Sequence, residues 1–155
     1  HVLGATVIAT AGGQAKCELV RALGAAHVLD YQTTDWVAET RKITGKQGVD
    51  VVFEHTGAVT FDGSLKVLAR GGRVVTCGAT TGGNVQISLH QVFFKSLSIL
   101  GSTMGSKGDL RRVLKLVEQG RLRPVVDRAL PMAQVGEAHR LLEERRAMGK
   151  IALLV

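Results

Sequence analysis

Five short segments of small and polar residues lie at the ends of apolar runs and carry the groups that could contact a ligand. They are residues 10–13, 30–31, 55–58, 78–83 and 102–105. Glycine lets a backbone approach a ligand closely, and backbone N–H groups near helix N-termini bind anions. One such segment is ordinary turn chemistry. Five in succession predict a rim that contacts a flat, extended ligand.

The apolar runs before these segments predict the strands that would position them. They are rich in valine and isoleucine and do not alternate strictly, which is typical of strands covered on both faces. They occupy residues 5–10, 27–31, 49–54, 72–78 and 96–102. Ligands bind beyond the carboxyl ends of parallel strands, which is where the five segments lie.

Helices are expected between these strands. Their predicted ranges are 14–23, 35–44 and 60–70. Thr33 and Thr34 are candidate N-caps of the second helix, and a glycine ends each of the three. Strands that alternate with helices through short connections favour an α/β fold, a doubly wound parallel sheet with right-handed crossovers.

After residue 105 the pattern changes. The segment "SKGDLRRVLKLVEQGRLRP" predicts an amphipathic helix, followed by a strand over 125–131, a helix over 133–149 and a strand over 150–155. A short strand-helix-strand return of this kind does not extend a doubly wound sheet. It is expected to belong to another domain.

Composition bounds the class of protein. The chain has 155 residues, 45% of them hydrophobic and 21% charged, which is typical of one soluble globular domain. The sequence contains no membrane-spanning run and no signal peptide, so a cytoplasmic protein is expected. Cys17 and Cys77 are isolated from each other and from any histidine cluster, so no structural zinc site is expected.

The net charge of +7 leaves two readings open. Much of the excess is scattered over helical segments, which favours solvated helix faces around a phosphate-binding site. Nucleic-acid binding is the less favoured reading, because one tryptophan and one tyrosine offer little for base stacking.

Five quoted segments carry a resemblance to a known family. "ATVIATAGGQAKCELVRALGAAHVLDY", "GVDVVFEHTGA", "GGRVVTCGATTG", "LSILGSTMGS" and "HRLLEERRAMGKIALLV" resemble the medium-chain dehydrogenase/reductases, which include zinc-type alcohol dehydrogenases and quinone oxidoreductases. The resemblance covers the whole chain in order.

The resemblance implies a two-domain oxidoreductase that moves hydride between a nicotinamide and a small alcohol, aldehyde, ketone or quinone. Residues 1–124 would be its dinucleotide-binding Rossmann domain, and residues 125–155 would belong to its catalytic domain. The family's G-x-G-x-x-G turn, the strand before it and its zinc ligands match nothing here. We therefore expect an N-terminally truncated Rossmann domain, no catalytic residue and no metal ligand in this chain, any zinc lying outside it, and no turnover by the chain alone.

The absent strand would be the central one. With the strand order 3-2-1-4-5-6, its absence separates the strands over 5–10 and 27–31 from the other three. A fragment of a longer protein, closure of the sheet across the gap, and a strand from another chain are three explanations. The uncovered strand edges would be an aggregation hazard unless something covers them. The first explanation is favoured.

Cofactor choice depends on the first turn. Residues 10–13 supply no carboxylate for the ribose of NAD, whereas Lys16 follows on the first helical turn and suits the 2′-phosphate of NADP. Family resemblance adds Tyr31. NADP(H) is therefore predicted, with NAD(H) as the second choice.

The remaining predicted cofactor-binding residues lie at the strand ends. They are Gly12, Gly13, His55, Thr56, Gly57, Gly78, Ala79, Thr80, Ser102, Thr103 and Met104, with Lys150 near the end of the chain. The edge strand over 96–102 is expected to pair with a second copy in a homodimer. The alternative function is a non-catalytic dinucleotide- or RNA-binding module.

Overall fold

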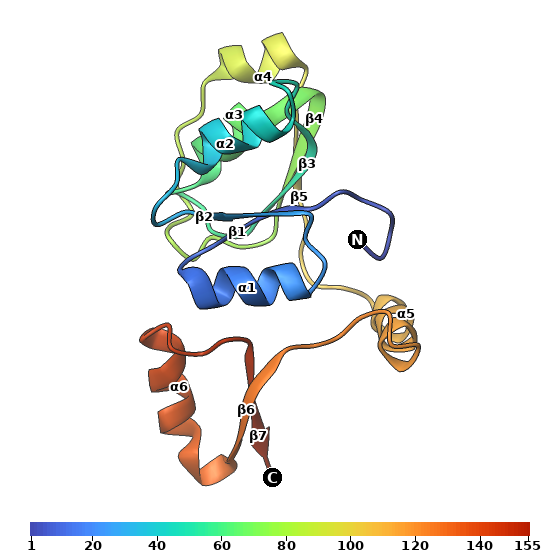
Figure 1. The fold of residues 1–155 in the computed structure, drawn as a ribbon, viewed down its shortest axis with the longest axis vertical. Helices are drawn as coiled ribbons and strands as arrows, with labels where there is room; N and C mark the ends of the chain where they lie inside the picture. The colour runs from blue at the N-terminus through green and yellow to red at the C-terminus, as the bar shows by residue number, and fades with distance from the viewer. The chain divides into compact units, whose positions relative to one another are not determined.

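A computed structural model describes residues 1–155 and divides them into two compact units. The first unit holds residues 6–105 with His1, and the second holds residues 106–155 with residues 2–5. Strands and helices alternate along the chain (Figure 1), and every strand pairing is parallel. The predicted α/β class is therefore confirmed.

The first unit contains five strands and four helices. They are β1 (Ile8–Ala11), α1 (Gln14–Ala22), β2 (His27–Asp30), α2 (Trp36–Ile43), β3 (Val49–Glu54), α3 (Phe61–Val67), β4 (Leu68–Thr76), α4 (Leu89–Lys95) and β5 (Ser98–Gly101). β1 pairs with β2, while β3, β4 and β5 form a separate sheet in that order. β1 and β3 are not hydrogen-bonded to each other, so the sheet does not close across the predicted gap.

The parallel register brings the carboxyl ends of paired strands level with one another. In the first sheet Ala11 is opposite Asp30. In the second, Thr76 lies opposite Glu54 on one side and Gly101 on the other. The turns that follow these residues therefore lie at one edge of each sheet. We call these turns the carboxyl edge.

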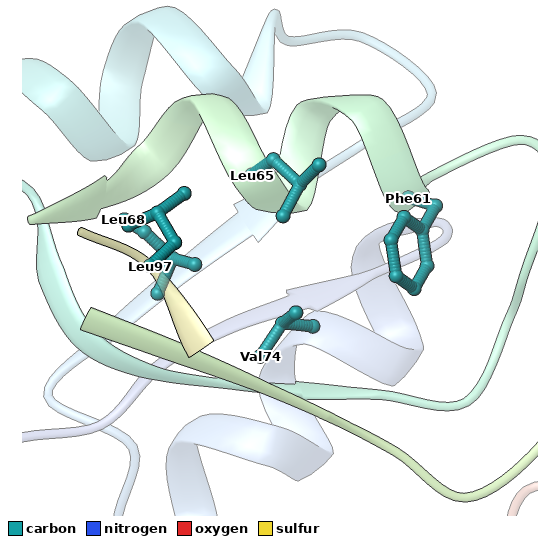
Figure 2. Close-up of a cluster of buried hydrophobic side chains, with 5 residues drawn as sticks. All are labelled: Phe61, Leu65, Leu68, Val74 and Leu97. Atoms are coloured by element: carbon teal, nitrogen blue, oxygen red, sulfur yellow. The ribbon is translucent and has the colours of Figure 1, made fainter. Parts of the chain in front are cut away.

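One hydrophobic core supports the sheet of β3, β4 and β5 (Figure 2). It joins α3 to β4 and to the residue before β5 through Phe61, Leu65, Leu68, Val74 and Leu97. Full burial of each such side chain contributes about 1.5–3 kcal/mol. Val49, Val52 and Val92 pack against this cluster.

The other face of β3 is open. Because side chains alternate along a strand, Val51 and Phe53 point away from the face of Val52, and they are 44% and 70% exposed. The two faces of this sheet are therefore covered unequally.

Several boundaries differ from those predicted for the first unit: β1 starts at Ile8 and not at residue 5, and β5 is shorter than the predicted 96–102. α3 ends at Val67, and β4 starts at Leu68 instead of residue 72. The pairing shifts between Val49 and Val51, so the residues around Gly71 bulge out of the ladder. The N-cap of α2 is Asp35, whose Oδ1 accepts from the N–H groups of Val37 and Ala38, and not Thr33 or Thr34. The sequence interpretation did not include α4.

The second unit contains α5 (Lys107–Glu118), β6 (Val126–Pro131), a 3-10 turn (Met132–Gln134), α6 (Val135–Glu143) and β7 (Lys150–Leu154). β6 and β7 pair in parallel. Ser106 and Asp109 form a capping box at the start of α5. α6 ends six residues before the predicted limit of 149, and Arg145 just beyond it takes a positive φ of 57°.

The assignment of residues 125–155 to a catalytic domain stays a prediction, and the compact units divide after Gly105. None of the helices combines the length and the apolar character that crossing a membrane requires.

Candidate functional site

The turn between β1 and α1 lies against the residue that follows β2. A Cβ added at Gly12 would lie 2.5 Å from the hydroxyl oxygen of Tyr31, so a larger residue would displace the ring from its present position. Gly13 has a φ of 83° and is the N-cap of α1. The structure thus brings together three of the residues predicted from sequence, Gly12, Gly13 and Tyr31.

A carboxylate that the cofactor prediction did not include also lies at this turn. Oδ1 of Asp30, the last residue of β2, accepts from the N–H of Gly13 at 3.2 Å and from that of Gln32 at 3.0 Å. The sequence interpretation looked for an acid only directly after β1. The signal that could have found Asp30 is the parallel pairing of the two strands, which sets Asp30 opposite Ala11.

The N-terminus of α1 favours an anion. Gly13 supplies no side-chain cap, and the first turn of α1 contains no acidic residue. Lys16 lies half-buried on that turn. Unpaired N–H groups and the helix dipole make such an end electropositive.

Glu54 organises the turn after β3, and sequence reasoning missed it. Its side chain is 3% exposed, although carboxylates are seldom fully buried. Oε1 accepts from the N–H groups of Thr56 at 2.7 Å and Gly57 at 3.1 Å and from the hydroxyl of Thr60 at 2.9 Å. Oε2 accepts from the hydroxyl of Ser64 at 2.5 Å.

These four donors determine the charge state of Glu54. Burial raises the pKa of the carboxyl, but the hydrogen bonds from Ser64, Thr56, Gly57 and Thr60 outweigh burial, and the pKa lies below its ordinary value. Glu54 is therefore ionised and holds the turn that carries the predicted His55, Thr56 and Gly57. The N–H groups of Thr56 and Gly57, two residues predicted to bind the cofactor, donate to the carboxylate of Glu54.

The turns after β3 and β4 are hydrogen-bonded to each other. The N–H and the hydroxyl of Thr81 both donate to the carbonyl oxygen of Thr56 at 2.8 Å. The hydroxyl of Thr80 donates to the same oxygen at 3.4 Å. A Cβ added at Gly57 would lie 2.5 Å from the carbonyl oxygen of Gly82, so this approach requires glycine. Thr81 is a second residue that the sequence interpretation did not include.

Gly78 and Ala79 lie in this paired region, while His55 is exposed and its imidazole makes no hydrogen bond. The turn after β5 joins the same edge, because the N–H of Ser102 donates to the carbonyl oxygen of Thr76 at 2.9 Å. Thr103 is exposed, and Met104 is 94% exposed with a φ of 51°.

Lys150 belongs to the second unit, at the start of β7, where its N–H donates to the carbonyl oxygen of Val125. It is not among the residues that the first unit brings together. Its predicted role in cofactor binding stays a prediction.

The donor set for a metal ion is not present. No group of three or more histidine, cysteine, aspartate or glutamate side chains is placed to hold one.

Comparison with known proteins gives the family. The sequence model described as zinc-binding dehydrogenase matches residues 1–119. The chain is 28% identical to the human quinone oxidoreductase over 159 residues, which cover 98% of this chain and 48% of that protein. The chain thus spans about half the length of the curated relatives it matches.

Solved structures agree with this match. The chain resembles the crystal structure of an NAD-dependent alcohol dehydrogenase with a TM-score of 0.92 and 48% identity, over 98% of this chain and 44% of that one. It also resembles a crotonyl-CoA carboxylase/reductase, AntE, in complex with NADP. There the TM-score is 0.89 at 26% identity, over 99% of this chain and 44% of that one.

Proposed function

The chain belongs to the zinc-binding dehydrogenase family, and we propose that it is the dinucleotide-binding part of an NAD(P)-dependent oxidoreductase. In the proposed reaction, hydride passes between the nicotinamide and a small alcohol, aldehyde, ketone or quinone. The observation that carries the proposal is the carboxyl edge, where glycine-containing turns from both sheets of the first unit follow level strand ends.

The residues of this edge fit a dinucleotide. Gly12 lies under the ring of Tyr31, and Gly13 gives α1 an N-terminus without a side-chain cap. Such an end suits a phosphate on the adenosine half of the ligand. The turn after β3 is held by the carboxylate of Glu54, and Thr81 bonds the turn after β4 to it. Both turns would contact the remainder of the extended ligand through their backbone.

The residues do not fit a zinc site, so no part of the proposed function of this chain runs through zinc. The chain spans about half the length of its relatives. The proposed substrates and activity of the whole protein are therefore inferred from the family and not from residues of this chain.

The preference between the two cofactors depends on opposing charges. Lys16 on the first turn of α1 favours the 2′-phosphate of NADP(H). The carboxylate of Asp30, bound to the N–H of Gly13, opposes a phosphate there. We propose NADP(H) as the preferred cofactor, by a margin that Asp30 reduces.

Titration of the full chain with NADPH and NADH, followed by nicotinamide fluorescence, tests this proposal. Lys16→Gln should weaken NADPH binding about tenfold and NADH binding much less, because one charge pair with the phosphate is lost. Asp30→Asn keeps an acceptor for Gly13 and should strengthen NADPH binding several-fold.

Lys107→Gln, on α5 of the second unit, controls for net charge. Tighter binding of NADH than of NADPH by the unaltered chain would reject the cofactor preference. Absence of binding by either dinucleotide would reject the proposed function.

We also propose that β5 pairs with a second copy of the chain. β5 is the last strand in its sheet, and all of its residues are exposed, including Ile99 at 40% and Leu100 at 44%. An uncovered edge with apolar side chains is suited to pairing with another strand.

A further inference from the structure

A small cavity lies at the opposite end of the sheet of β3, β4 and β5 from the carboxyl edge. Gly48, just before β3, and Leu68, the first residue of β4, line it. The six residues of β3 span roughly 20 Å between this end and the carboxyl edge. The cavity is therefore separate from the site proposed for the dinucleotide.

Five cationic side chains surround this space of about 140 Å³, which we call the basic cavity. They are Arg41, Lys46, Lys66, Arg70 and Lys95. They come from three helices and one strand or from the turns beside them, and are up to 54 positions apart in the chain. The fold, and not a local run of sequence, gathers this charge.

Two of the cations are fixed by backbone carbonyls. Nζ of Lys95 donates to the carbonyl oxygens of Lys66 and Leu68, both at 2.9 Å. Nη1 of Arg70 donates to the carbonyl oxygen of Phe94 at 2.9 Å. These bonds tie α4 to the junction of α3 and β4 and hold both cationic groups at the cavity without neutralising them.

The other three cations have little anionic compensation. Lys66 pairs with Asp62 at 2.6 Å on the surface of α3. The side chains of Arg41 and Lys46 make no ion pair with a carboxylate and no hydrogen bond. Five cations at this cavity are thus matched by one carboxylate.

The simplest explanation of the basic residues is that they neutralise helix C-termini. α2, α3 and α4 end at Ile43, Val67 and Lys95, and each end carries at most about half a negative charge. Together with Asp62 they offset about half of the five positive charges. Roughly two and a half positive charges remain, so neutralisation of the helices does not account for the cluster.

Lys95 shows the cost of this arrangement. It is half-buried, and burial together with the nearby charge of Arg41 lowers its pKa. Like charges held together in a partly desolvated space are unfavourable unless an anion joins them.

We propose that the basic cavity binds a small, multiply charged phosphate compound, of the inorganic phosphate, pyrophosphate or phosphomonoester class. Guanidinium and ammonium groups together bind phosphate oxygens by charge-assisted hydrogen bonds. The volume suits one such group with a few waters. No aromatic side chain lines the cavity, so it has no platform for stacked bases of a nucleic acid.

Calorimetric titration of the full chain with pyrophosphate, at an ionic strength of about 20 mM to limit screening, tests the proposal. The double variant Arg41→Gln/Lys46→Gln removes two cavity charges that make no hydrogen bond. Lys107→Gln/Arg111→Gln removes the same two residue types from α5, which belongs to the second unit and contributes no residue to the cavity lining.

We expect saturable binding to the unaltered chain and to the α5 variant, within about twofold. We expect binding at least about tenfold weaker in the cavity variant. Amide resonances of Lys46 and Gly48 should shift on binding. If the cavity variant fails to fold, Lys46→Gln alone replaces it, because Lys46 lies beyond the last turn of α2.

Three results would overturn the proposal. They are no saturable binding of pyrophosphate, equal weakening in the α5 variant, and weakening by Lys16→Gln instead of by the cavity variant. The last result would place the anion at α1 and leave the proposed dinucleotide function intact. If the chain binds pyrophosphate in the basic cavity but does not bind NADPH, the dinucleotide function is rejected and the basic cavity proposal stands.

Discussion

At the residue scale, a buried carboxylate does more to shape the candidate site than the glycines that draw attention in the sequence. Glu54 accepts four hydrogen bonds from residues that follow it by two to ten positions. From sequence, a glutamate at the end of a strand is expected to be exposed. Its burial was not predictable, because its hydrogen-bond donors converge only when α3 packs on the sheet. The glycines were predictable because a turn requires them locally.

Replacement of Glu54 should destabilise the fold by an amount that depends on the acceptor that remains. Glu54→Ala leaves buried donors at Thr56, Gly57 and Ser64 without a partner and should cost about 3–5 kcal/mol. Glu54→Gln keeps one oxygen for the donors of Oε1, and its amide can donate to the hydroxyl of Ser64. It should cost about 1–2 kcal/mol. Urea unfolding followed by circular dichroism measures both.

The same pair of proteins gives a pH signature. The pKa of Glu54 is lower in the folded chain than its ordinary value of 4.5, so its ionised form stabilises the fold above that value. This contribution is lost as the pH falls through the folded pKa. The difference in unfolding free energy between the unaltered chain and Glu54→Gln should therefore shrink from pH 7 towards pH 3. A constant difference would show that the charge of Glu54 has no part in stability.

At the scale of the elements, the sequence predicted the positions of β1, β2, β3 and β5 within a few residues, because runs of β-branched residues and helix-ending glycines are local signals. The sequence did not predict the boundaries that depend on tertiary contacts between strands. β4 begins at Leu68 because the ladder with β3 recruits residues that have a helical pattern. α4 was missed because seven residues without a side-chain cap give a weak signal.

The unpaired edge of β5 predicts that two copies of the chain form a dimer. If two copies pair there, light scattering at micromolar concentration should give twice the mass of the chain. Ile99→Lys should shift the population to the monomer, because a charged side chain on an edge strand opposes pairing. Leu89→Lys, on α4, changes an apolar residue that is 68% exposed and should leave the mass unchanged. A monomeric mass for the unaltered chain would remove the proposed pairing.

At the scale of the whole molecule, the separation of the β1-β2 pair from the sheet of β3, β4 and β5 was predictable from the ordered motifs together with the expected strand order. β1 and β3 each keep an unpaired edge, as the order 3-2-1-4-5-6 requires when strand 1 is absent. The surplus positive charge was also visible in the sequence. Its concentration at the basic cavity was not, because the contributing residues meet only in the folded chain.

The proposed function requires that the carboxyl edge bind a nicotinamide dinucleotide. Titration of the ¹⁵N-labelled full chain with NADPH, followed by amide chemical shifts, tests it most directly. Saturable shifts are expected at Gly12, Gly13, Gly57 and Gly78, with the resonances of Gly45 and Gly48 near the basic cavity largely unchanged. Saturable binding that shifts Gly45 and Gly48 and leaves the carboxyl edge unchanged would contradict dinucleotide binding at that edge.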